Sequence, residues 1–79
     1  MLFEKTAIVT GAASGIGYAV AQALRQEGAQ VVMADVNEAL LIESARELGG
    51  VPFVGNLTRR EDCRRLVEFT VERFGGVDI

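Results

Sequence analysis

The chain has 79 residues, of which 49% are apolar and 24% are charged, and its formal net charge is -3 with no histidine. This composition is typical of a folded globular chain and excludes the disordered and collagen-like classes. The negative charge gives no electrostatic basis for binding nucleic acid or an anionic membrane. Because domains usually have roughly 100 to 150 residues, we expect one domain at most, with a small core.

Cysteine content and hydropathy narrow the setting of the protein. Cys63 is the only cysteine, so the chain can form neither an internal disulfide nor a thiolate metal cluster, and we predict no metal site. No apolar run approaches the roughly 20 residues of a membrane span, and residues 1–5 lack the pattern of a secretory signal peptide. The default expectation is a cytoplasmic protein without a membrane partner.

The first predicted unit is a strand, a glycine-rich turn and a helix. Thr6–Thr10 is a nearly continuous apolar run, which is typical of a strand covered on both faces. Beyond the glycines the apolar residues follow a helical period, and Gly28 can close that helix. The inner stripe of the helix is predicted to be Ile16, Ala19, Val20, Ala23 and Leu24.

The same order of elements then repeats. Val31–Ala34 forms a second buried-strand run that ends at Asp35, and Asn37 is placed to cap a helix that continues to Leu48. The inner face of this helix is predicted to be Leu41, Ala45 and Leu48.

A third strand is predicted at Val51–Val54. Pro52 has no backbone N–H to donate to a neighbouring strand, so we place this strand at the edge of the sheet. A third helix should begin at Thr58, because Thr58 and Glu61 match the capping-box pattern.

The third helix carries a clear apolar stripe and a cluster of arginines. The stripe is predicted to be Cys63, Leu66, Val67, Thr70, Val71 and Phe74, with Cys63 and Phe74 as core residues. Glu61 and Glu68 lie at ion-pair spacing from the arginines, so we predict a solvated, salt-bridged face and not a docking patch. The arginines are Arg59, Arg60, Arg64 and Arg65. Residues 77–79 look like the start of a fourth strand.

Strands that alternate with helices predict an α/β fold with a parallel sheet. Parallel neighbours need crossover connections, and right-handed crossovers place helices on both faces. The expected architecture is a Rossmann-like three-layer half-domain with strand order 3-2-1 and the start of strand 4 beside strand 1. Residues 1–79 would then form one partial Rossmann domain.

The stretch TGAASGIG places Gly11, Gly15 and Gly17 where the first strand meets the first helix. A helix start offers unpaired amides and the positive end of the helix dipole, which suits a phosphate, and glycines let the ligand approach the backbone. The alternative is a tight strand-to-helix turn without a ligand. Asp35 favours the ligand, because it follows at about the distance, roughly 20 residues, at which dinucleotide folds place a ribose-binding carboxylate.

Two other glycine-loop classes fit less well. A nucleoside-triphosphate loop needs a lysine after its last glycine, whereas Tyr18 follows Gly17. A methyltransferase loop is spaced GxGxG, and this one is spaced GxxxGxG.

These motifs resemble those of the short-chain dehydrogenases and reductases. TGAASGIG looks like the TGxxxGxG cofactor motif of that family, and ADVN, GNLT and FGGVDI follow in the expected order and spacing. The resemblance covers essentially the whole chain. It implies hydride transfer between a nicotinamide cofactor and an alcohol or carbonyl compound.

The resemblance also implies a role for individual residues. Asp35 would bind the adenosine ribose, while Asn56 and Leu57 would flank the adenine. Most family members carry Asp where this chain has Asn56, but an amide still offers an oxygen acceptor to the adenine amino group. The residues expected to line the pyrophosphate are Gly11, Ser14, Gly15, Ile16 and Gly17.

The cofactor is predicted to be NAD and not NADP. The Asp35 carboxylate would repel the additional phosphate of NADP. Relatives that use NADP commonly carry arginine in place of Ser14 or Val36, and neither residue is basic here. Asp35 and Val36 therefore both favour NAD.

No catalytic residue is assigned to this chain. The family uses a Tyr and Lys pair with a Ser and an Asn, but the only tyrosine, Tyr18, is followed four residues later by Gln22 and not by lysine. We expect the chain alone to be inactive, and full-length relatives to be homo-oligomers. A nonenzymatic nucleotide-binding or interaction module is the alternative. An exposed edge at Thr6–Thr10 would also make the isolated chain weakly stable, self-associating or dependent on a partner.

Overall fold

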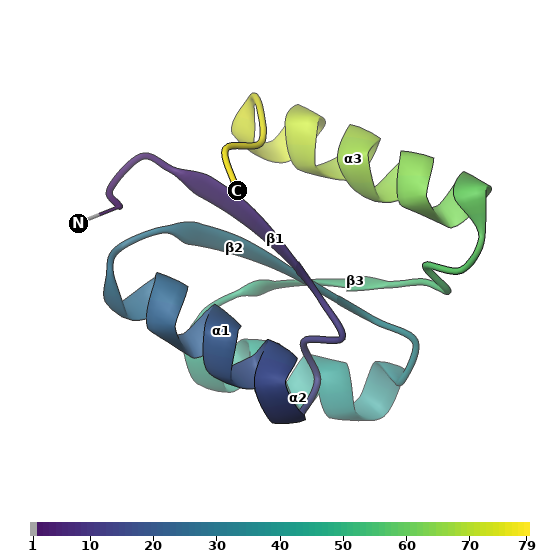
Figure 1. The fold of residues 1–79 in the computed structure, drawn as a ribbon, viewed down its shortest axis with the longest axis horizontal. Helices are drawn as coiled ribbons and strands as arrows, with labels where there is room; N and C mark the ends of the chain where they lie inside the picture. The colour runs from purple at the N-terminus through teal and green to yellow at the C-terminus, as the bar shows by residue number, and fades with distance from the viewer. Residues whose placement is uncertain (1) are drawn as a thin grey trace.

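A computed structural model describes residues 2–79, which form three strands and three helices in strict alternation. The elements in chain order are β1 (Thr6–Thr10), α1 (Gly15–Gln26), β2 (Gln30–Asp35), α2 (Glu38–Leu48), β3 (Val51–Val54) and α3 (Arg60–Phe74). The sheet is parallel, with the order β1-β2-β3. Helices α1 and α2 lie on one face and α3 on the other (Figure 1). The predicted three-layer α/β half-domain is confirmed.

Alternate residues of the strands point to opposite layers, as the period of a strand requires. Val31 and Met33 of β2 belong to the core beneath α1 and α2, and both are buried. Val32 and Ala34 belong to the core beneath α3 and are also buried. The central strand is therefore covered on both faces, which explains its continuous apolar run.

The end of the chain pairs with β1. The Ile8 N–H donates to the Ile79 carbonyl at 3.0 Å, and the Ile79 N–H donates to the Thr6 carbonyl at 3.1 Å. In Figure 1 the carboxyl end of the chain likewise lies beside β1. The end of the chain thus lies where the start of a fourth strand was predicted, although the sheet itself has three strands, and β3, which contains Pro52, lies at the opposite edge as predicted.

The predicted inner stripe of α1 is wrong. Ile16 is 85% exposed and Val20 is 44% exposed, whereas Ala21 is fully buried. A Cβ at Gly17 would overlap the carbonyl oxygen of Gly11, so α1 rests on the glycine loop at this point. That backbone contact fixes the rotation of the helix, because residues four and seven positions later share the face of Gly17. Tyr18 and Leu24 accordingly pack against the core with Ala21. Of the predicted stripe only Leu24 is in place, since Ala19 and Ala23 are exposed.

The start of α3 also differs from the prediction. The helix begins at Arg60, and its N-cap residue, Arg59, makes no side-chain capping bond. Thr58 does not form the capping box, because its hydroxyl donates to the Asn56 side chain instead. Cys63 is exposed and not a core residue, and its thiol lies 3.2 Å from the Leu57 carbonyl oxygen.

The remaining inner face of α3 is smaller than predicted. Leu66 and Thr70 are buried, and Phe74 packs against the same core from a partly buried position. Val67 and Val71 are 49% and 44% exposed. None of the helices in residues 2–79 combines the length and hydropathy needed to cross a membrane.

Candidate functional site

The glycine-rich loop between β1 and α1 has an open side and a packed side. Gly11 and Gly15 have φ angles of 62° and 61°, a region that favours glycine. A Cβ at either position would meet no protein atom within 4 Å. At Gly17, in contrast, a Cβ would collide with the Gly11 backbone. Gly17 thus serves helix packing, whereas Gly11 and Gly15 let the backbone of the loop face outward.

The first turn of α1 presents free backbone donors. The first bond of the helix runs from the Tyr18 N–H to the Ser14 carbonyl at 3.3 Å. The N–H groups of Gly15, Ile16 and Gly17 precede this bond and have no acceptor within the helix. Ser14 is exposed and its hydroxyl makes no capping bond. With no acidic residue in the first turn, this helix start is suited to an anion.

Three hydrogen bonds hold the loop in this shape. The Ala12 N–H donates to the Ala34 carbonyl at 3.1 Å, and the Ala13 N–H donates to Asp35 Oδ2 at 3.1 Å. The Ser44 hydroxyl, 2.7 Å away, donates to the Ala13 carbonyl. β2 and α2 therefore position the loop that β1 carries.

Ser44 is a residue that the sequence interpretation missed. It is 3% exposed and lies on the inner face of α2 next to Ala45. A serine on an otherwise apolar helix face is the signal that could have found it, because a buried hydroxyl needs a partner.

Asp35 points toward the glycine loop. Besides the bond from Ala13, its Oδ1 accepts the N–H groups of Val36 at 2.7 Å and of Asn37 at 3.1 Å. Burial raises the pKa of this carboxyl, but the hydrogen bonds from Asn37, Ala13 and Val36 outweigh it and the pKa is lowered. A carboxylate offers about four acceptor positions. Oδ1 accepts two hydrogen bonds and Oδ2 accepts one, so Oδ2 has one acceptor position left for a ligand hydroxyl.

A cleft of about 380 Å³ is lined by residues at the carboxyl ends of β1, β2 and β3 and in the loops that follow them. It brings together five of the nine predicted site residues, namely Gly11, Asp35, Val36, Asn56 and Leu57. It also includes three that were not predicted, namely Thr10, Gly55 and Thr58. Ser14, Gly15, Ile16 and Gly17 are outside its lining and form the adjoining start of α1. A larger hollow of about 610 Å³ along α3 shares no residue with this cleft.

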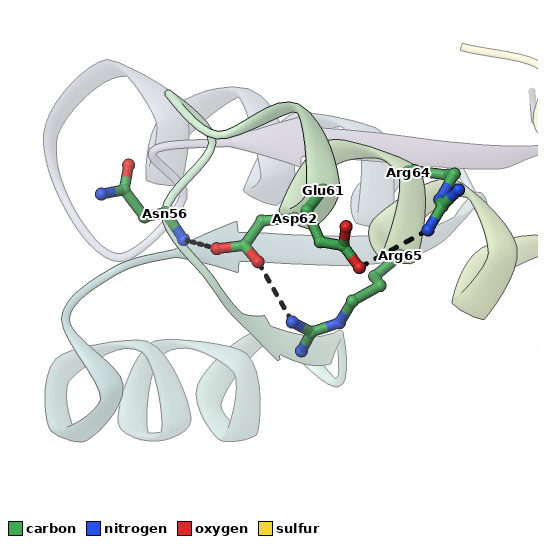
Figure 2. Close-up of polar contacts among 5 residues, drawn as sticks. All are labelled: Asn56, Glu61, Asp62, Arg64 and Arg65. Carbon is green, nitrogen blue, oxygen red and sulfur yellow. Dashed lines mark hydrogen bonds and ion pairs between the residues drawn. The ribbon is translucent and has the colours of Figure 1, made fainter.

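The loop after β3 is fixed from α3. The Asn56 N–H donates to Asp62 Oδ2 at 2.8 Å, and Arg65 pairs with Asp62 Oδ1 at 3.1 Å (Figure 2). A second ion pair, Arg64 with Glu61 at 3.5 Å, lies on the same turns of α3. The predicted salt-bridged surface is confirmed for these arginines, with Asp62 as the partner of Arg65.

The side chain of Asn56 is held by Thr58. Asn56 Oδ1 accepts the Thr58 N–H at 3.0 Å and the Thr58 hydroxyl at 2.6 Å. Because a carbonyl oxygen has two lone pairs, both are used within the loop. The expected oxygen acceptor for an adenine amino group is therefore already engaged.

Comparison with known proteins agrees with this architecture. The family model for short chain dehydrogenase matches residues 5–79. A diacetyl reductase ((S)-acetoin forming) of Staphylococcus epidermidis is 38% identical over 81 residues, covering 96% of this chain and 32% of the relative. An L-fucose dehydrogenase of Bos taurus is 45% identical over 75 residues, covering 94% of this chain and 28% of the relative.

A solved structure has the same fold. The apo form of LigD from Sphingobium superposes with a TM-score of 0.91 at 29% identity, covering 95% of this chain and 34% of LigD. The chain thus spans about a third of the length of the proteins it matches. Since the family model covers nearly all of the sequence, the chain belongs to the short-chain dehydrogenase family of oxidoreductases and corresponds to an amino-terminal portion of a family member.

Proposed function

We propose that this chain is the NAD-binding portion of an oxidoreductase that transfers hydride between a nicotinamide cofactor and an alcohol or carbonyl substrate. The observation that carries the proposal is the 3.1 Å hydrogen bond from the Ala13 N–H to Asp35 Oδ2. This bond joins the phosphate-type loop and the ribose-type carboxylate into one site, with donors on one side and an acceptor on the other.

The residues fit the parts of a dinucleotide in order. The start of α1, with Ser14, Gly15, Ile16 and Gly17, supplies N–H donors for a pyrophosphate, and the glycine at position 11 leaves room in front of the loop. Asp35 Oδ2 retains an acceptor position for one ribose hydroxyl. Beyond it, Val36 and Leu57 provide apolar walls for a flat base.

The charge at the ribose position supports NAD over NADP. The pKa of Asp35 is lowered, because the backbone bonds that stabilise its carboxylate outweigh the effect of burial, so the group is ionised at neutral pH. A phosphate on the ribose would then face a negative charge, and neither Ser14 nor Val36 brings a positive one. When bound, the nicotinamide ring supplies or accepts the hydride; the residues described here bind and orient the other end of the molecule.

Isothermal titration with NAD, NADP and ADP-ribose tests this proposal on the folded chain. We expect saturable binding of NAD and ADP-ribose and much weaker binding of NADP. Asp35→Ala should weaken NAD binding by about tenfold, the loss of one good hydrogen bond to a charged group, and should narrow the difference between NAD and NADP. Equal affinity of the wild type for NAD and NADP, or no binding of any of the three, would refute it.

A further inference from the structure

We infer that the cleft reads the base of its dinucleotide with a hydrogen-bond donor, the side-chain Nδ2 of Asn56, and not with an acceptor. This inference rests on the proposed function, because it takes the cleft to hold a nucleoside. It goes beyond it by naming the group on the base that is recognised.

Thr58 fixes the orientation of the Asn56 side-chain amide. The backbone N–H of Thr58 can only donate, and the side-chain atom of Asn56 that lies 3.0 Å from it must therefore be the oxygen. The Thr58 hydroxyl donates to the same oxygen at 2.6 Å. Turning the amide over would place an NH₂ group against the Thr58 N–H and leave two donors facing each other. The orientation is thus fixed by the loop itself.

Within residues 2–79, the nitrogen of the Asn56 side-chain amide, Nδ2, has no hydrogen-bond partner. Among the described residues no acceptor bonds Asn56 Nδ2, and no buried side-chain nitrogen or oxygen lacks a partner. Nδ2 is therefore open to solvent on a residue that lines the cleft. Figure 2 shows the side chain of Asn56 directed away from Asp62, which bonds only the backbone N–H of Asn56.

The base of a bound nucleoside would lie next to the loop after β3. The Gly55 N–H donates to the Asp35 carbonyl at 3.1 Å, so the loop after β3 runs directly beside the residue that would hold the ribose. A nucleoside with its sugar at Asp35 and its phosphates at the glycine loop would place its base between Val36 and Leu57, next to Asn56. The edge of the base then meets the Asn56 side chain.

A carboxylate at position 56 would behave differently. It could accept both Thr58 bonds on one oxygen and present the second oxygen as an acceptor. An asparagine held in the same way presents an NH₂ group. The exchange of one oxygen for nitrogen therefore reverses the hydrogen-bonding sense at the base, from an acceptor suited to an exocyclic amino group to a donor suited to a ring nitrogen or a carbonyl.

The test compares NAD with nicotinamide hypoxanthine dinucleotide, which carries a carbonyl in place of the adenine amino group. The measured quantity is the ratio of the two dissociation constants, obtained by isothermal titration. The wild type should bind the hypoxanthine compound at least as tightly as NAD. Asn56→Asp should reverse this order and prefer NAD by about tenfold, because its carboxylate pairs with the amino group and is repelled by the carbonyl.

The matched control is Asp62→Asn, the opposite exchange in the same loop. It weakens the anchor of the Asn56 backbone without altering the amide, so both affinities should fall together and their ratio should stay that of the wild type. A wild type that prefers NAD as strongly as Asn56→Asp would overturn the inference while leaving the proposed function intact. Failure of the wild type to bind either dinucleotide would overturn both.

Discussion

The Ser44 hydroxyl of α2 donates a 2.7 Å hydrogen bond to the Ala13 carbonyl of the glycine loop, in a fully packed environment. The neighbouring Ala13 N–H donates to Asp35 Oδ2, so both polar groups of one peptide residue are held by different elements. The shape of the loop is thus set by β2 and α2 before any ligand binds. This arrangement reduces the ordering that a ligand would otherwise have to impose.

Replacing Ser44 with alanine should destabilise the fold and weaken phosphate binding. The Ala13 carbonyl would lose its buried donor, which costs about 1–3 kcal/mol of the free energy of unfolding. Urea denaturation measures this loss, and titration with ADP-ribose and adenosine should show a larger decrease in affinity for the phosphorylated compound. Glu43→Ala on the exposed side of α2 is the control and should change the free energy of unfolding by less than about 0.5 kcal/mol.

Replacing Gly17 with alanine should be among the most damaging single changes. The added methyl group would collide with the Gly11 carbonyl and push α1 off the loop, at a cost of about 3 kcal/mol or more. Gly15→Ala meets no atom but has φ 61°, so a cost of about 1–2 kcal/mol is expected. Gly76→Ala has neither problem and serves as the control in thermal or urea denaturation. Equal stability of the Gly17→Ala and Gly76→Ala variants would contradict the packing role.

The hydrogen bonds to Asp35 should make the free energy of unfolding decrease at acidic pH. Three backbone N–H groups stabilise the Asp35 carboxylate more than burial destabilises it, so the pKa of Asp35 in the folded state is lowered from its ordinary value. A lowered folded pKa contributes stability that is present above the ordinary pKa of the group and is lost as the pH falls through the folded value. Urea denaturation at a series of pH values measures this slope. Asp35→Asn should flatten it, and an unchanged slope would show that other carboxyl groups cause it.

The isolated chain should self-associate through its exposed apolar side chains. Val67 and Val71 are adjacent on α3 and are 49% and 44% exposed, and Ile16 on α1 is 85% exposed. Sedimentation velocity should show concentration-dependent association, and Val67→Lys with Val71→Lys should reduce it, whereas Glu68→Lys should not. A monomer with a cooperative unfolding free energy of about 5 kcal/mol or more would contradict this prediction.

The sequence by itself determined the order of elements, the parallel sheet and the residues at the ends of the strands. Apolar runs and glycines act locally, so the bounds of Thr6–Thr10 and Val51–Val54 and the cap at Asn37 could be predicted correctly. The position of Asp35 next to the glycine loop also followed, because the ends of neighbouring parallel strands meet at one edge of the sheet.

Only the tertiary structure decided which face of α1 packs against the sheet and which hydrogen-bond partners the polar side chains have. The rotation of α1 depends on the backbone contact between Gly17 and Gly11, which no apolar period records. Thr58 matches the capping-box pattern, yet its hydroxyl donates to the Asn56 side chain, and α3 begins at Arg60. The first choice is made by a backbone contact across the glycine loop, whose shape is held by β2 and α2, and the second by competing partners within one loop. The shape of the glycine loop exists only once β2 and α2 have packed beside it.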